Sequence, residues 1–506
     1  MMYVLHIAIW IIKIILNFVV LNYRSMRNLF LIFYTVLLLF VSCSKSVDNQ
    51  ENINEESIAK DLTIFIVNDI HGQIDNFSKI KYIIDKEREV TNVIVTGGGD
   101  LFSGNPVVDN FPEKGYPIID LMNRVGFDIS VIGNHEYDYG EVNLKNRIDQ
   151  ANFDWVCANV NMSSSGVPQP FEYTTISVDN LKVTFLGLVE TNGKEDATIP
   201  STHPWRVENF IFERPEDVVA SYSKIKEQEN SDLYVALTHI GNRGNHGELG
   251  DHQLAEQFPY FDLIIGGHSH SIINDVVNRI PIFQAGSNLK NMGKIELTIT
   301  DKKIKTVEYE LIDLNNHVEE DTELKEVIQE YNDAPYLNEV IGFSQLNHEN
   351  SQIGCFITDA LRTEMGVDLT FQNTGGVRSD LDYGDVTRRM IFEILPFNNP
   401  VVIYEMTVSE IKDFLISSGS GFYYSGVIFV KNSGVLYVKD LNGEILSDKT
   451  ILSVGVNDYI PAVFDTYFPT DGIIQPLTDA EIVISYLEEI NDQINYTGCN
   501  NYFRYN

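Results

Sequence analysis

Five short apolar segments before residue 271 each end in a loop that combines glycine with Asp, Asn or His. These loops span residues 68–72, 97–100, 133–136, 238–241 and 266–270. Short apolar segments separated by polar, helix-like stretches predict a layered α/β domain. Because ligands bind at the carboxyl ends of the strands in open α/β sheets, we expect the five loops to converge on one crevice.

Seven apolar segments are predicted strands: Leu62–Val67, Val93–Val95, Ile129–Ile132, Trp155–Ala158, Val183–Leu188, Leu233–Leu237 and Leu263–Ile265. After the first of them, apolar residues recur at helical spacing from Phe77 to Ile84, which predicts an amphipathic crossover helix. The charged, helix-like stretch 318–332 lacks a strong apolar stripe and is interpreted as a connector. A helix at Ile353–Arg362 and a strand at Leu369–Phe371 then begin a second domain, which a chain of 506 residues is long enough to contain.

The side chains in the five loops have the chemistry of metal ligands. They include five of the eleven histidines, two aspartates and an asparagine, whose N and O atoms suit divalent cations. One histidine near a strand end is usually structural, but five after successive strands indicate a metal site. The neighbouring glycines permit the tight turns that such a site requires.

The charge of the chain narrows the possible partners. Thirty-six basic residues against 72 acidic ones give a formal charge of -36, which repels nucleic-acid polymers and anionic lipid headgroups. A phosphate-bearing substrate therefore needs a local positive centre, and bound metal ions could provide it.

The order of the loop motifs, D-x-H, G-D, G-N-H-E, T-H-x-G and G-G-H-S-H, resembles that of the calcineurin-like metallophosphoesterases. The longer strings at 68–72 and 133–140 resemble the 5'-nucleotidase branch of that family. The resemblance implies an α/β fold with an N-terminal β-sandwich flanked by helices (61–317), a linker helix (318–335) and a C-terminal α/β nucleotide-binding domain (336–506). The ordered set of motifs is far more specific than any one of them.

The resemblance also implies two divalent metal ions, as Mn, Zn, Mg or Fe. The implied ligands are Asp69, His71 and His270 for one ion, Asn134, His239 and His268 for the other, and Asp100 as the bridge between them. Two such ions can activate a water molecule and neutralise the oxygens of a phosphate.

His135 follows the ligand position Asn134, and in this family it points at the substrate. Its implied role is to stabilise charge on the phosphoryl or leaving oxygen. Asp138 would orient His135 and raise its pKa. The alternative is that Glu136 and Asp138 are turn residues on a solvated loop.

In the second half, residues 373–378 and 395–399 resemble nucleotide-binding elements of the same family. The implied substrate contacts are Asn373, Gly375, Arg378, Phe397, Asn399, Tyr459 and Asp465, with a base stacked between Phe397 and Tyr459. Relatives carry glycines where this chain has Val463 and Phe464, and they place an arginine near 347–351 that this chain lacks. Arg378 is then the one clear cation of the predicted pocket. The alternative for Phe397 and Tyr459 is that they are ordinary core residues.

The N-terminus is interpreted as an export signal. Residues 1–43 form a predicted leader, with Met26 as a possible true start, and 44–60 form a flexible tether. The stretch Phe40–Cys43 resembles a bacterial lipobox, which implies a lipoprotein with Cys43 as its lipidated residue. The expected location is the bacterial cell envelope. The protein is expected to contact the membrane only through a lipid anchor on Cys43. The alternative is a pair of membrane helices, although both apolar runs are short for spanning.

Several residues carry no predicted role. The spacing of Cys157, Cys355 and Cys499 does not decide their pairing. His246 and His252 are expected to be solvated, and His203, His317 and His348 match no motif. The sequence does not indicate an oligomeric state.

The predicted function is two-metal hydrolysis of nucleoside 5'-monophosphates to nucleoside and phosphate outside the cytoplasm, with other nucleotides as further candidate substrates. The enzymatic alternatives are a 2',3'-cyclic nucleotide phosphodiesterase and a nucleotide-sugar hydrolase. A non-catalytic surface binding lipoprotein is the alternative of another class.

Overall fold

The computed structural model describes residues 59–244, 248–490 and 493–505. The predicted leader (1–43), nearly all of the predicted tether (44–60) and His246 lie outside these residues. Within them, no helix combines the length and the apolar character needed to cross a membrane.

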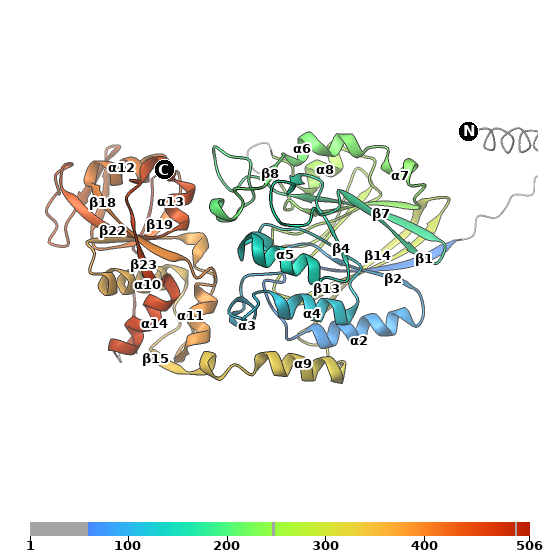
Figure 1. Cartoon of the computed structure of the whole chain (residues 1–506), viewed down its shortest axis with the longest axis horizontal. Coiled ribbons are helices and arrows are strands. Elements are labelled where there is room, and N and C mark those ends of the chain that lie inside the picture. Colours follow the sequence, from blue (N-terminus) through green and yellow to red (C-terminus); the bar gives the residue numbers. More distant parts are fainter. Residues whose placement is uncertain (1–58, 245–247, 491–492, 506) are drawn as a thin grey trace, which may run out of the picture. The chain divides into compact units, whose positions relative to one another are not determined.

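Two six-stranded sheets form the first half of the described chain (Figure 1). The first sheet has the order β14 (Lys303–Asp313), β13 (Asn291–Thr300), β1 (Lys60–Val67), β2 (Asn92–Gly97), β3 (Ile129–Val131) and β4 (Asp154–Val156). The second has the order β11 (Ile272–Val277), β12 (Ile280–Ala285), β10 (Leu263–Ile265), β9 (Leu233–His239), β7 (Leu181–Val189) and β6 (Tyr173–Val178). All seven predicted strands are present.

The two sheets pack face to face through a shared apolar core. In β1, Leu62, Ile64 and Ile66 belong to the core between the sheets, whereas Phe65 and Val67 face the opposite way into a helix-covered core. Burial on both faces explains why this strand reads as a continuous apolar run and not as an alternating one.

Helices cover the outer faces of both sheets (Figure 1). Over the first sheet lie α2 (Phe77–Arg88), α4 (Tyr116–Val125), α5 (Gly140–Gln150) and α9 (Thr322–Asn332), and over the second lie α6 (Pro215–Val218), α7 (Ile225–Gln228) and α8 (Asp251–Gln257). The predicted crossover helix is α2. The expectation that the connector lacks a core stripe is wrong, because Leu324 and Ile328 of α9 are buried against the first sheet's helices.

The C-terminal half is built on a third six-stranded sheet. Its order is β23 (Ile473–Thr478), β18 (Pro400–Thr407), β22 (Ile451–Asn457), β16 (Leu369–Asn373), β19 (Gly421–Ser425) and β25 (Tyr502–Arg504). The flanking helices are α10 (Asn350–Met365), α11 (Arg388–Ile394), α12 (Val408–Ser417), α13 (Tyr459–Val463) and α14 (Asp479–Ile490). A small sheet adds β17 (Gly384–Thr387), β15 (Val340–Ser344) and β24 (Gln493–Ile494), and β20 (Ile428–Asn432) and β21 (Val435–Lys439) form a hairpin. The predicted mixed α/β, two-domain class is confirmed.

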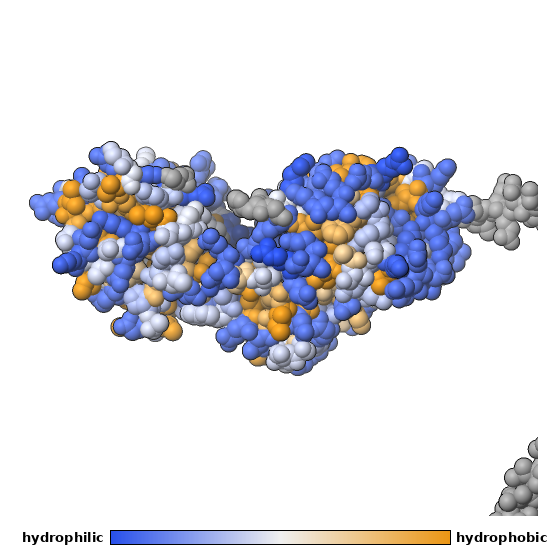
Figure 2. Space-filling view, turned by 90° about the horizontal axis from the view of Figure 1, so that it is seen from above, coloured by the Kyte–Doolittle hydropathy of each residue, from blue (hydrophilic) through white to orange (hydrophobic). Residues whose placement is uncertain are grey.

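The surface drawn in Figure 2 is largely hydrophilic, with apolar patches scattered across it. This agrees with the strongly acidic composition of the chain.

One disulfide links the C-terminal segment to the domain. Cys355 of α10 is bonded to Cys499, 144 residues further along the chain, while Cys157 is a buried free thiol. Sequence spacing left this pairing open, because the two residues meet only when β25 pairs with β19.

Replacing Cys499 with Ser is expected to lower the free energy of unfolding by about 2–4 kcal/mol, since the cross-link restricts the unfolded chain. Urea unfolding measures the change. A reductant should lower the unfolding midpoint of the wild-type protein to that of the variant and leave the variant unchanged. Equal unfolding midpoints for the wild-type protein and the variant in the absence of reductant would contradict the prediction.

Candidate metal centre and adjoining pocket

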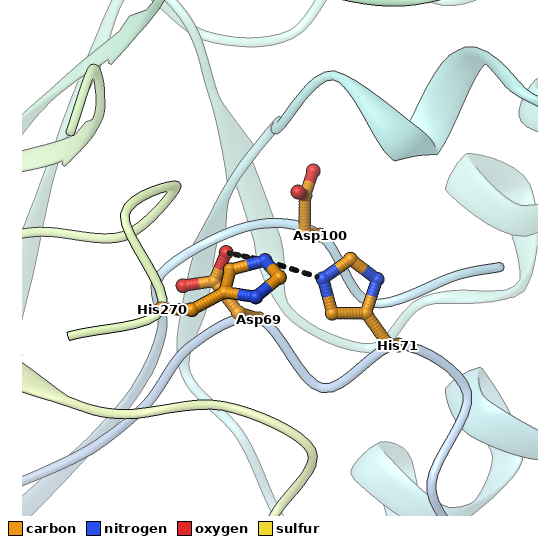
Figure 3. Close-up of side chains that lie close together, drawn as sticks. All are labelled: Asp69, His71, Asp100 and His270. Atoms are coloured by element: carbon orange, nitrogen blue, oxygen red, sulfur yellow. Dashed lines mark hydrogen bonds and ion pairs between the residues drawn. The ribbon is translucent and has the colours of Figure 1, made fainter. Parts of the chain in front are cut away.

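The five predicted loops meet at one edge of the sandwich. Asp69 and His71 follow β1, Asp100 follows β2, His239 ends β9, and His268 and His270 follow β10. Two groups of ligand atoms result, each with atoms within 4.8 Å of one another: Asp69, His71, Asp100 and His270, and Asp100, His239 and His268. Figure 3 shows that the four side chains of the first group lie close together. Asp100 is common to both groups.

The backbone of these loops is held in an uncommon conformation. Asp69, His71, Asp100, His268 and His270 all have positive φ, between 49° and 75°. Non-glycine residues in this region cost about 1–3 kcal/mol each, and they persist where the surroundings enforce them, often at functional sites. Five of the seven predicted ligands share this strain.

The hydrogen bonds of two histidines direct the Nε2 atoms of their rings into the centre. His71 donates Nδ1–H to Ser103 O at 3.0 Å, and His239 donates Nδ1–H to Gly98 O at 2.7 Å. Because Nδ1 is the donor in both rings, Nε2 is the nitrogen that can bind a metal ion when the ring is neutral. His71 Nε2 lies 2.9 Å from His270 Nε2, and His239 Nε2 lies 3.1 Å from Asp100 Oδ2.

This arrangement fits divalent cations. His, Asp and Asn are ordinary ligands of such ions, and a cation between these ring nitrogens and carboxylate oxygens could be bound by both. The amide of Asn134 completes the set, because its Oδ1 lies 3.2 Å from His239 Nε2 and 3.0 Å from His268 Nδ1.

The electrostatics of the buried groups also indicate a need for positive charge. Burial opposes the charged form of His239, but the Asp100 carboxylate and its hydrogen bond outweigh burial and raise the pKa of His239 to about 10. Burial raises the pKa of Asp69 to about 7. Burial lowers the pKa of His270 to about 4, which keeps that ring neutral and available as a ligand.

Glu136 binds the backbone of two of the ligand loops. Its carboxylate is fully buried and accepts the backbone N–H groups of Gly133, Asp100 and Leu101. The alternative that placed it on a solvated loop is wrong. It fixes two ligand loops together, and a side chain on Gly133 would collide with Asp100, since a Cβ there would lie 2.4 Å from Asp100 Oδ1.

His135 and Asp138 form a buried pair beside the metal ligands. His135 Nδ1 donates to Asp138 Oδ2 at 2.6 Å, and His135 Nε2 faces Asp100 Oδ2 at 3.8 Å. Burial opposes charge on His135, but the Asp100 and Asp138 carboxylates outweigh it and raise its pKa. Burial likewise disfavours the Asp138 carboxylate, but His135 and then Arg206 outweigh it and hold the pKa of Asp138 below its usual value. Asp138 is therefore not a solvated turn residue.

A cavity of about 420 Å³ joins this pair to the C-terminal half. Six predicted substrate residues line it: Asn373, Gly375, Arg378, Phe397, Asn399 and Tyr459. The Phe397 ring stacks on His135 with centroids 5.6 Å apart. Phe397 and Tyr459 are partly exposed and belong to none of the core clusters among the described residues, so neither is an ordinary core aromatic.

Asp465 is not brought to this cavity. Its carboxylate instead accepts from Lys194 Nζ at 2.9 Å. The departure from the glycine-rich sequence of relatives falls in this same stretch, where Asp465 begins a short 3-10 turn after Phe464.

Four cavity residues in the loop after β7 carried no sequence signal: Ser201, Thr202, His203 and Arg206. Arg206 and His203 lie in the loop after β7 and line the same cavity, so the expectation that Arg378 is the one clear pocket cation is wrong. The Arg206 guanidinium donates to Asn399 Oδ1 at 3.4 Å, from 193 residues away. No motif marks this loop, and its role follows only from the tertiary fold.

Three further histidines of the described residues, His252, His317 and His348, are outside the ligand groups. His252 is buried and its Nε2 lies 3.3 Å from Asp275 Oδ2, so the expectation that it is solvated is wrong. His348 is buried between Ser344 Oγ and the Tyr496 N–H, a structural position. His317 lies near Glu319.

Comparison with known protein families matches both halves of the chain. Residues 62–271 match the calcineurin-like phosphoesterases, and residues 333–505 match the 5'-nucleotidase C-terminal domain. The chain belongs to this two-domain family. The predicted family is thereby confirmed.

Individual relatives are distant. The trifunctional nucleotide phosphoesterase protein YfkN of Bacillus subtilis is 27% identical over 76% of this chain, which spans only 29% of that relative's length. A 5'-nucleotidase of Vibrio cholerae is 25% identical over 84% of this chain and 90% of its own length. The crystal structure of a 5'-nucleotidase precursor from Thermus thermophilus superimposes with a TM-score of 0.75 at 21% identity, covering 85% of this chain and 97% of that one. This last similarity supports the fold.

Proposed function

We propose that the protein hydrolyses nucleoside 5'-monophosphates to a nucleoside and phosphate, with two divalent metal ions bound. One observation carries the proposal: Asp100, His135 and His270 line the same cavity as Arg378 and Phe397. A substrate in that cavity can therefore reach the candidate metal centre and the nucleotide-type residues at once. The names of the Bacillus and Vibrio relatives agree with this substrate class.

The residues assigned to the ions are those predicted from the motifs. Asp69, His71 and His270 would hold one ion, Asn134, His239 and His268 the other, and Asp100 both. When bound, such ions lower the pKa of a water molecule and neutralise phosphate oxygens.

His135 would stabilise the oxygen on which negative charge develops. Its Nδ1 is held by Asp138, so its Nε2 is the nitrogen that faces the cavity side of Asp100. The raised pKa favours an imidazolium, which can donate a hydrogen bond or a proton to a phosphoryl or leaving oxygen.

The C-terminal half would supply substrate binding. The Arg378 guanidinium lies 5.9 Å from the Phe397 ring centroid, which places a cation beside an aromatic face suited to a base. Stacking of a base on an aromatic ring contributes about 1–3 kcal/mol in nucleic-acid complexes. Asn373, Gly375, Asn399 and Tyr459 would complete the pocket.

The disulfide supports action outside the cytoplasm, since structural disulfides are typical of exported proteins. We assign the lipid anchor to Cys43, in the leader that lies outside the described residues.

A second cavity favours phosphodiesters as additional substrates. It has a volume of about 600 Å³ and shares His270 and Arg378 with the first. A second substituent on the phosphate would have room there, as in a cyclic nucleotide or a nucleotide sugar.

Phosphate release by the full chain with Mn²⁺ tests these proposals. AMP and other nucleoside monophosphates are compared with a 2',3'-cyclic nucleotide, a nucleotide sugar and p-nitrophenyl phosphate. We expect AMP to be hydrolysed with the highest kcat/KM. Turnover of AMP no faster than p-nitrophenyl phosphate would refute the nucleotidase assignment, and absence of any turnover would favour a binding protein.

A further inference from the structure

Residues 201–206, here called the 201–206 segment, touch the metal ligands, the His135–Asp138 pair and the C-terminal half of the chain. The segment lies between β7 and β8 (Ile211–Phe212). It matches none of the motifs from which the site was predicted, although four of its residues line the cavity.

The start of the segment is tied to the end of β7. Glu190 accepts Ser201 N–H at 2.5 Å and Asn192 N–H at 2.9 Å, and Glu190 itself is buried. Ser201 O in turn accepts from Asn134 Nδ2 at 3.1 Å. This bond leaves Oδ1 of Asn134 directed toward His239 and His268.

Thr202 holds the second oxygen of Asp138. Its hydroxyl donates to Asp138 Oδ1 at 3.0 Å, while Asp138 Oδ2 accepts from His135. Thr202 is 2% exposed, so water does not replace this donor. A carboxylate fixed at both oxygens cannot rotate, and the ring that it holds is fixed with it.

The rest of the segment contacts the other half of the chain. His203 Nε2 lies 3.3 Å from Asp458 Oδ1, and Arg206 donates to Asn399 while lying 3.8 Å from Asp138 Oδ1. Neither ring nitrogen of His203 has a hydrogen-bond partner among the described residues. Asp458 Oδ1 also lacks a hydrogen-bond partner there, so the 3.3 Å approach of these two atoms is the polar contact of His203 with the C-terminal half.

We propose that Thr202 is a positioning residue for Asp138, and that the His203–Asp458 contact makes this positioning depend on the C-terminal half. The inference rests on the proposed function. Thr202 is outside the metal-ligand groups, and it sets the orientation of His135 through Asp138.

Steady-state kinetics of the full chain on AMP test the first part. Thr202→Val keeps the shape of the side chain and removes the hydroxyl, so kcat is expected to fall roughly tenfold with KM little changed, because the catalytic ring is misplaced. Thr202→Ser should restore most of kcat. Thr370→Val is the matched control, since Thr370 is also fully buried and donates its hydroxyl to the Thr358 carbonyl, and neither residue lines the cavity.

A double-mutant cycle tests the second part. His203→Phe keeps a ring beside Trp205 and Tyr459 and removes the contact with Asp458. If the His203–Asp458 contact helps to hold Thr202 in place, Thr202→Val lowers kcat less in the His203→Phe background than in the wild-type protein. Additive effects would overturn the coupling, and unchanged kcat in Thr202→Val would overturn the positioning role. An inactive wild-type protein would instead refute the proposed function.

Discussion

Replacing Asp100 with Asn is expected to lower phosphate release by roughly 10³-fold or more, because the variant loses the one carboxylate shared by both ligand groups. Asn keeps the volume of the side chain and one oxygen, so the fold should survive. The variant cannot supply the negative charge that two neighbouring cations require. Phosphate release from AMP and the metal content of the purified protein measure the effect.

Asp128→Asn is the matched control for this variant. Asp128 is a partly buried carboxylate that accepts the Val95 N–H at 2.8 Å, in the same half of the chain. Its replacement removes one charge without touching the ligand groups, so activity should remain near that of the wild type. Retention of activity in Asp100→Asn would contradict a mechanism with two ions bridged by this residue.

Replacing His135 with Ala is expected to lower kcat by about 10²–10⁴-fold, the range for loss of a general acid or base. The metal content should not change, since His135 is not among the ligand groups of the described residues. This separation distinguishes His135 from the ligands. Kinetics and metal analysis on the same samples provide both readouts.

His252→Gln serves as the control for His135. His252 is also buried and also lies beside a carboxylate, Asp275, but it is outside the cavity. Its replacement should leave kcat unchanged. If His135→Ala also left kcat unchanged, His135 would not act on the substrate.

The strands and loops of the metal centre were predictable because their chemistry is local. Each predicted loop follows its strand within a few residues. Parallel pairing of β1, β2 and β3 in one sheet and of β9 and β10 in the other therefore aligns the loops within each sheet. Glycines and histidines at fixed positions mark these turns in the sequence.

The strands β13 and β14 were not predicted, for a physical reason. In β14, apolar Ile304, Val307 and Tyr309 alternate with exposed charged residues. A strand with one face in solvent lacks the continuous apolar run by which the buried strands were found.

The contacts of the 201–206 segment could not be predicted from the sequence either. Thr202 meets Asp138 across 64 residues, and Arg206 meets Asn399 across 193. The first pair depends on how the loop after β7 folds within the N-terminal half, and the second on how the two halves pack. No residue type at these positions signals either contact. For the same reason Asp465, placed by its spacing from Tyr459, does not lie where the family pattern suggested.

The number of divalent ions bound per chain tests the central claim most directly. The full-length protein is stripped of metal, reconstituted with excess Mn²⁺, freed of unbound ions and subjected to elemental analysis. We predict about two ions per chain, as a dinuclear site requires. Fewer than one ion per chain would contradict the account.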